Sequence, residues 1–235
     1  MLAIFKREMR SYFSTPIGYV FLAVFLAVSG VVFALSTYMA DVASLSTYFT
    51  MMTVAYVLLI PILTMKIFSD ELRSKTDQLL LTAPVSLTGV VFAKYLAALS
   101  MYMIAVALSM VNFLFLVFNG YTVQAGIAVG MFVGMLLIGM ASIAVGVFIS
   151  ALTESQLVAV LLTMVSLTVM MFINAFNAFI PYTWIRIVLS WLAINGRYNT
   201  LAAGRFDFTA ILYYVSIAGA FLLLTIRVFE KKRWH

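Results

Sequence analysis

The sequence predicts an all-α, polytopic membrane protein, and three features support that prediction. Of the 235 residues, 65% are hydrophobic and only 9% are charged, whereas roughly 25% are charged in ordinary soluble domains. The apolar residues form six runs, each long enough for a helix that crosses a hydrocarbon core of about 30 Å. Most basic residues stand at the ends of these runs, where they set the orientation of membrane helices. A water-soluble globule and a disordered chain are therefore excluded.

The six apolar runs give the positions of the predicted spans. Their lengths leave no room for a separate soluble domain, so we expect residues 1–235 to form one transmembrane domain. The predicted spans are Ile17–Met39, Tyr48–Phe68, Val90–Phe118, Gly126–Leu152, Leu157–Ile180 and Phe208–Phe229.

Two shorter apolar segments lie outside the predicted spans. In Met1–Phe13, Phe5, Met9 and Tyr12 recur at helical spacing, which predicts an amphipathic helix that lies flat on the bilayer surface. The segment Tyr182–Ile194 is too short to cross a membrane as a helix and is typical of an interfacial or re-entrant element.

The distribution of Lys and Arg predicts the orientation of the chain. Three of these residues fall on one side of the predicted membrane: Arg186, Arg197 and Arg205. The other eleven fall on the opposite side: Lys6, Arg7, Arg10, Lys66, Arg73, Lys75, Lys94, Arg227, Lys231, Lys232 and Arg233. Because short cytoplasmic loops hold the excess of basic residues, we expect both termini in the cytoplasm of a multi-pass inner (plasma) membrane protein.

The composition also argues against several chemistries. The sequence has no phosphate-binding Gly-x-x-x-x-Gly-Lys-Ser/Thr loop, no cysteine, and a single histidine, His235. We therefore expect no enzymatic activity, metal site or cofactor in this chain. The basic residues form no stripe suited to nucleic acid, so no such partner is expected. Fifteen methionines could handle Cu(I), but their scattered positions favour flexible packing between helices.

The most polar stretch lies between the second and third spans. We expect Ser69 to cap a short helix there, with Leu72, Thr76, Leu79 and Leu80 along one face. Pro84 would end this helix. Two uses remain open: a helix resting in the bilayer interface, or a lever that inserts into a groove on a cytoplasmic partner.

The run Glu71–Ser86 resembles the coupling-helix signature of ABC-2 type ABC transporter permeases. It is most similar to the branch that contains the gliding-motility and copper-processing permeases, although Lys75 replaces a Gly of that pattern and Gln78 a Glu. The segments Gly146–Gln156 and Ala202–Asp207 resemble other parts of the same branch. The residues that match the signature are Glu71, Arg73, Ser74, Thr76, Leu79, Leu80, Leu81, Thr82 and Pro84.

The resemblance implies six helices per subunit and two subunits side by side, as a homodimer or a heterodimer. It places Tyr182–Ile194 at an extracellular re-entrant element. Cytoplasmic ATPases, which hold the ATP and Mg, would bind the coupling helices, and an extracytoplasmic accessory subunit is a further partner to consider. The residues expected to couple to the ATPase are Glu71, Leu72, Arg73, Ser74, Thr76, Leu79, Leu80 and Pro84. A second cytoplasmic turn, the other candidate site on that side, comprises Thr153, Glu154, Ser155 and Gln156.

These features predict a permease subunit that couples hydrolysis of ATP by a partner ATPase to substrate export. The alternative is a passive channel, or a membrane scaffold that docks a cytoplasmic protein through the same helix. The amides Asn112, Asn174 and Asn177 lie within or near spans, where they either bond neighbouring helices or line a substrate path. Small residues along the fourth span either pack within the subunit or form a subunit interface.

Overall fold

The structure, a computed structural model, describes residues 1–38, 45–76, 86–118, 125–176, 182–184, 186, 193 and 207–233. Every regular element within these ranges is a helix, and six helical stretches are long and apolar enough to cross a membrane. The prediction of an all-α, polytopic membrane protein is therefore confirmed. The six stretches are Pro16–Ser36, Thr47–Arg73, Leu87–Phe115, Gly126–Leu152, Gln156–Ile173 and Phe208–Arg233.

The elements follow the predicted order with two differences in detail. The third predicted span is divided at Met110 into two helices, and the first ends in a short π-helical segment. The elements are α1 (Leu2–Ser14), α2 (Pro16–Phe33), the π-helix η1 (Ala34–Tyr38), α3 (Leu45–Thr64), α4 (Ser69–Arg73), α6 (Leu87–Ser109), α7 (Val111–Phe118), α8 (Ala125–Leu152), α9 (Gln156–Phe176) and α12 (Phe208–Arg233).

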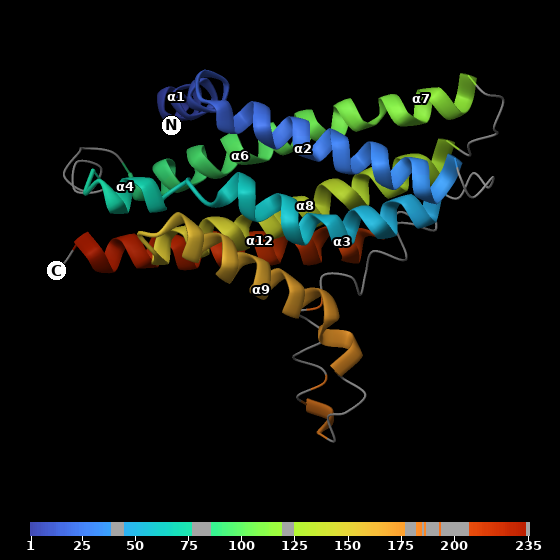
Figure 1. Ribbon diagram of the computed structural model, residues 1–235. Coiled ribbons are helices and arrows are strands. Elements are labelled where there is room, and N and C mark those ends of the chain that lie inside the picture. The colour runs from blue at the N-terminus through green and yellow to red at the C-terminus, as the bar shows by residue number, and fades with distance from the viewer. Residues whose placement is uncertain are drawn as a thin grey trace.

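Helix α8 is the centre of the bundle. It contacts α3, α6, α9 and α12. In its most apolar stretch of 18 residues, 72% of the residues are buried, against 28% in the corresponding stretches of α2 and α9. In Figure 1 the long helices run side by side, and α4 lies at the same end as both termini. That end holds the residues that the sequence analysis assigned to the cytoplasmic side.

Two glycines allow neighbouring helices to approach α8 closely. A β-carbon on Gly139 would lie 2.2 Å from the ring of Tyr102 in α6, and one on Gly146 would lie 2.3 Å from the Thr64 hydroxyl at the end of α3. The Tyr102 hydroxyl also donates a hydrogen bond to the Met135 carbonyl, at 2.7 Å. At these positions the small residues therefore serve packing within the chain, which was the first of the two uses considered.

Helix α1 lies across the end of the bundle. Thr15 is extended (φ −105°, ψ 153°) and Pro16 begins α2, so the chain turns sharply between the two helices. A β-carbon on Gly18 would lie 2.2 Å from the Tyr12 carbonyl oxygen, so this turn requires glycine. Figure 1 shows α1 nearly end-on beside helices that run across the view, which fits the predicted helix parallel to the membrane surface.

Candidate functional site

The start of α4 is held by helix α8. The backbone N–H groups of Phe68 and Ser69 donate to the Ser150 hydroxyl oxygen, at 3.0 and 3.2 Å. The expectation that Ser69 caps this helix is wrong: Phe68 occupies the cap position, and the Ser69 hydroxyl donates instead to the Met65 carbonyl. Amides at the start of a helix need acceptors, and here a residue 81 positions away supplies one.

The end of α4 differs from the prediction of one helix that continues to Pro84. Lys75 has φ 55°, in the left-handed region, and Thr76 and Lys75 donate their N–H groups to the carbonyls of Glu71 and Leu72. These two bonds form a Schellman motif, which ends a helix. Leu72 and Thr76 therefore share no face of a continuous helix. The predicted contact residues Leu79, Leu80 and Pro84, like Leu81 and Thr82, lie outside the described residues.

Lys75 stands where the resembling permeases have glycine, and its backbone explains that preference. A left-handed residue with a β-carbon costs about 1–2 kcal/mol relative to glycine, which adopts this region freely. We expect Lys75→Gly to stabilise the end of α4 by roughly 0.5–1 kcal/mol, which slower hydrogen exchange of the Lys75 and Thr76 amides would show. Lys75→Ala keeps the β-carbon and should give no such gain. Faster exchange in the glycine variant would contradict this account.

The side chains of α4 divide between the core and the surface. Leu72 is only 5% exposed and belongs to the hydrophobic core, and the ring of its neighbour Phe68 lies 4.7 Å from that of Phe229 in α12. Arg73, Ser74 and Thr76 are exposed. Among the predicted contact residues of this segment, Leu72 thus anchors α4 internally, while Arg73, Ser74 and Thr76 lie on the surface.

The structure brings the second predicted turn to the same place. Gln156, at the start of α9, donates a side-chain hydrogen bond to the Asp70 carboxylate of α4. Glu154 and Ser155 are exposed, and the Ser155 N–H donates to the Thr153 hydroxyl at 3.2 Å. The two segments that the sequence analysis singled out are therefore adjacent. We call the exposed residues 73–76 and 154–155 the end surface.

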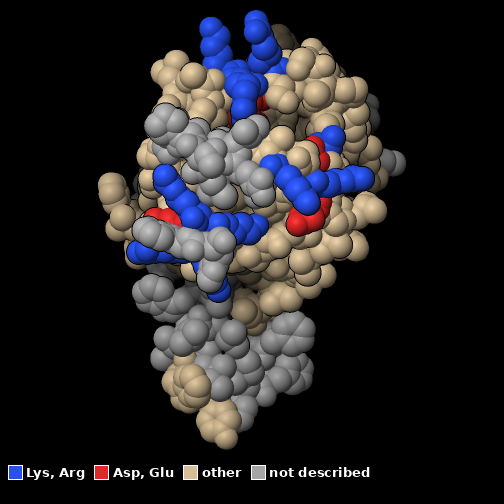
Figure 2. Space-filling model, turned by 90° about the vertical axis from the view of Figure 1, so that its left-hand side faces the viewer, with Lys and Arg blue, Asp and Glu red and all other residues tan. Residues whose placement is uncertain are grey.

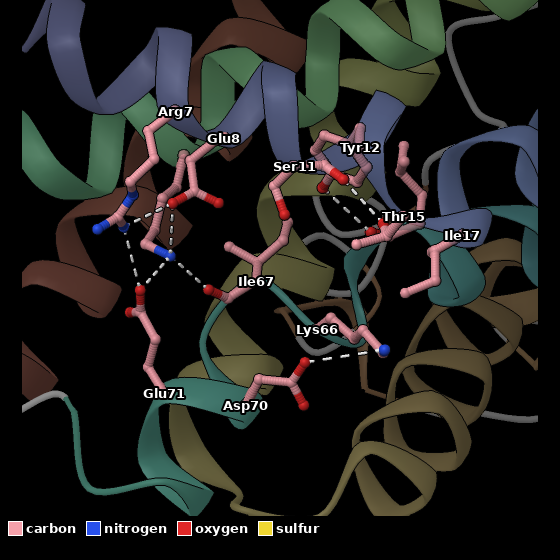
Figure 3. A pocket seen from close by; sticks show the side chains of 12 residues that line it. Arg7, Glu8, Ser11, Tyr12, Thr15, Ile17, Lys66, Ile67, Asp70 and Glu71 are labelled. Atoms are coloured by element: carbon pink, nitrogen blue, oxygen red, sulfur yellow. Dashed lines mark hydrogen bonds and ion pairs between the residues drawn. The ribbon is translucent and has the colours of Figure 1, made fainter.

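A buried lysine connects α4 to two further helices. Lys94, in α6, has a side chain that is only 2% exposed, and its Nζ lies 2.8 Å from Glu71 Oε1 and 3.4 Å from Glu8 Oε1. It also donates to the Ile67 carbonyl at 2.8 Å. Arg7 lies 2.7 Å from Glu8 and 3.4 Å from Glu71 (Figure 3). We call Arg7, Glu8, Glu71 and Lys94 the charge cluster.

Two side chains of α1 have raised pKa values. The hydrogen bond with Glu8 raises the pKa of Arg7 above its ordinary value, so this guanidinium stays charged. Burial, with a contribution from the Glu8 charge, raises the pKa of Tyr12, so its phenol stays neutral and can donate to the Leu63 carbonyl at 3.4 Å. Helix α1 is thus fixed to the bundle by its own polar residues.

In the sequence, Lys94 was interpreted only as one of the basic residues that set the orientation of the chain. The signal that could have identified it is its position four residues inside the predicted third span, away from the end of the run. A lysine at such a depth pairs with acids or carbonyls and faces the bundle interior. The sequence could not show which acids, because Glu8 and Glu71 are distant along the chain.

Of the three asparagines singled out in or near the spans, the structure describes the side chain of Asn112 alone. Asn112 of α7 donates to the Ser29 hydroxyl of α2 at 2.9 Å, and Ser29 lies 2.8 Å from the Tyr48 hydroxyl of α3. This arrangement matches the interhelical bonding that was the first use considered for Asn112. Asn174 is part of α9, with a side chain that is not described, and Asn177 lies outside the described residues.

Basic side chains gather at the end of the bundle that holds α4. Figure 2, which views the end that holds α4 and both termini, shows Lys and Arg over much of this face.

The family model for ABC-2 family transporter proteins matches residues 6–171, which is more than half of the chain. The chain belongs to the ABC-2 family of transporter proteins. The sequence resemblance to that family is therefore confirmed, whereas the particular branch stays a prediction.

Family membership makes this chain a multi-pass membrane subunit of an ABC transporter, of the kind that generally works with cytoplasmic ATPase subunits and is normally not catalytic itself. The matched region includes the whole charge cluster and the turn at residues 153–156. No curated protein matches the chain.

Proposed function

We propose that this ABC-2 chain transmits ATP-driven movement of a partner ATPase to its membrane helices and so exports a substrate. The end surface is the contact for that ATPase. The observation that supports this most directly is the division of α4: Arg73–Thr76 is exposed, whereas Leu72 and Phe68 are buried in the core. A segment built in this way can receive a force at the protein surface and transmit it to the core of the helix bundle.

The contacts of α4 indicate which helices would receive that force. Its start is bonded to Ser150 of α8, Asp70 to Gln156 of α9, and Glu71 to Lys94 of α6. An ATPase can shift the spans only if its ATP-bound and ATP-free states contact the end surface differently. Movement of α4 would then reach three spans directly, and α1 through Glu8.

The proposal includes an orientation and an assembly. The excess of basic residues on the side of the termini supports a cytoplasmic location for that end in the plasma membrane. The ATP and Mg would be held by the partner ATPase. A second permease copy, identical or homologous, would complete the transporter.

Site-directed crosslinking tests the contact and the orientation together, because the chain has no cysteine of its own. Ser74→Cys and Ser155→Cys, both exposed on the end surface, should crosslink to a co-expressed ATPase through a short thiol-reactive reagent. Thr209→Cys is the control, since Thr209 is exposed at the far end of α12. It should give no crosslink to a cytoplasmic protein.

Hydrolysis separates the transporter from the alternative functions. A coupled permease should raise the ATP hydrolysis of the co-purified ATPase above that of the ATPase alone, whereas a scaffold would bind it without such an effect. Crosslinks from Thr209→Cys, or none from either end-surface cysteine while the ATPase co-purifies, would overturn the proposed contact.

A further inference from the structure

A cavity of about 340 Å³, lined by both polar and apolar side chains, lies between α1 and the junction of α3 with α4. Figure 3 shows Ser11 and Tyr12 of α1 and the adjoining Thr15 on one side of it and Lys66 and Asp70 on the other. Its volume falls within the range of roughly 300–1,000 Å³ that is usual for small-molecule sites. The residues that line it are Arg7, Glu8, Ser11, Tyr12, Thr15, Ile17, Leu63, Lys66, Ile67, Asp70, Glu71 and Lys94.

The charges of the lining favour a zwitterion. Among the described residues, three basic and three acidic side chains line the cavity, so their formal charges sum to zero and favour neither an anion nor a cation overall. Within the described part of the chain, most of these groups are engaged in the charge cluster. Lys66 and Asp70 are paired loosely, with Nζ and Oδ2 3.9 Å apart and side chains 37% and 42% exposed.

The long distance between Lys66 and Asp70 leaves both side chains able to bind a ligand that carries a negative and a positive charge. Charge-assisted hydrogen bonds of this type are normally about 2.7–2.9 Å long, so the Lys66 ammonium has donor capacity to spare. A phosphate could accept from Lys66 and from the Ser11 hydroxyl, while an ammonium on the same ligand donates to Asp70. A quaternary ammonium would need a cage of aromatic rings. Of the lining residues that the structure describes, Tyr12 alone is aromatic.

The apolar part of the lining indicates how such a ligand arrives. Ile17 lies in the first turn of α2 and Leu63 in the last turn of α3, so the cavity extends to the level where two spans meet the interface. Helix α1, which lies across the bundle, supplies four of its lining residues and so forms one wall of the cavity. A lipid could place its headgroup in the cavity and continue its acyl chains past these residues into the bilayer.

We propose that this cavity binds the headgroup of a phospholipid with a primary ammonium, with its phosphate on Lys66 and its ammonium on Asp70. Because Asp70 also accepts a hydrogen bond from Gln156, the bound headgroup would contact the network that supports the end surface. The proposal concerns this chain alone and needs no ATPase, so its test and that of the proposed function fail separately.

Native mass spectrometry of the purified chain with added lipids tests the site. Phosphatidylethanolamine should be retained about ten-fold better than phosphatidylcholine of the same acyl chains, because trimethylation removes the N–H donors. It should also be retained better than phosphatidylglycerol, which lacks the ammonium. Soluble phosphoethanolamine tests the source of the ligand, and it should bind far more weakly than the lipid because it leaves the apolar lining unused.

Variants of Lys66 and of Asp70 test the two proposed charge contacts separately. Lys66→Met should reduce retention of phosphatidylethanolamine about ten-fold, and Lys66→Arg should retain most of it. Asp70→Asn should remove the preference over phosphatidylcholine, while the amide oxygen can still accept from Gln156. Lys231→Met, which removes an exposed lysine at the same end of the bundle, is the control and should change nothing.

Several results would overturn this site. They are equal retention of phosphatidylethanolamine and phosphatidylcholine, a preference for phosphatidylglycerol, unchanged retention in Lys66→Met, and binding of phosphoethanolamine as tight as that of the lipid. Thermal unfolding without lipid identifies any variant that is simply misfolded. If Lys66→Met is misfolded, the retention of phosphatidylethanolamine by Lys66→Arg, compared with that of the parent chain, tests the site.

Discussion

Replacing Lys94 with methionine should lower the free energy of unfolding by about 3–5 kcal/mol, the usual cost of removing one partner from a buried ion pair. The reason is that Glu8 and Glu71 would keep their charges next to an apolar side chain. Both carboxylates are only 18% exposed, so water could solvate them poorly. Thermal unfolding of the purified chain in a mild detergent would measure this loss.

The charge left behind, more than the lost lysine, should account for the effect. The triple variant Lys94→Met, Glu8→Gln and Glu71→Gln leaves no carboxylate in the charge cluster, and the one charge that remains there, that of Arg7, is 58% exposed to water. We therefore expect it to recover most of the stability. Arg7→Met is the matched control. Arg7 is 58% exposed, and exposed ion pairs contribute about 0.2–1 kcal/mol. If Lys94→Met unfolded like the parent chain, the charge cluster would have no structural importance.

Gly139→Ala should destabilise the bundle by about 1–3 kcal/mol, although alanine normally favours a helix over glycine. The new β-carbon would lie 2.2 Å from two ring atoms of Tyr102. That ring cannot easily withdraw, because its hydroxyl is bonded to the Met135 carbonyl. Helices α6 and α8 would have to separate. The melting temperature in detergent would report the loss.

Gly219→Ala, in α12, is the control for this steric effect. A β-carbon there would have no atom within 4 Å, so the change should be neutral or slightly stabilising. The double variant Gly139→Ala, Tyr102→Leu should lose less than the sum of the two single changes, since leucine removes the ring that collides. Simple additivity would show that Tyr102 is not the obstacle.

The spans and the N-terminal helix could be predicted because apolar run length and helical periodicity are local properties of a sequence. The span boundaries came out within a few residues for most helices, as with Gly126–Leu152. The interruption at Met110 was not predicted, because no proline or glycine marks it. The end of α4 was missed because Lys75, unlike the glycine it replaces, gives no signal for a left-handed residue.

The tertiary partners at the site could not be predicted. Ser150 is unremarkable in the sequence, and the depth of Lys94 in its predicted span indicates a buried partner without naming it. Their roles depend on helix crossings that bring them to Phe68 and Glu71. The sequence did indicate the two segments that meet at the end surface, because both are polar interruptions on one side of the membrane.

The bond between Ser150 and the start of α4 has a consequence for spontaneous motion. If α4 left α8, two buried amides would lose their acceptor, at a cost of about 1–3 kcal/mol each. At a total of about 4 kcal/mol, roughly one molecule in a thousand would be detached at any moment. Thermal motion therefore leaves α4 attached to α8 almost all of the time, and moving it separately from the bundle requires work supplied by another protein.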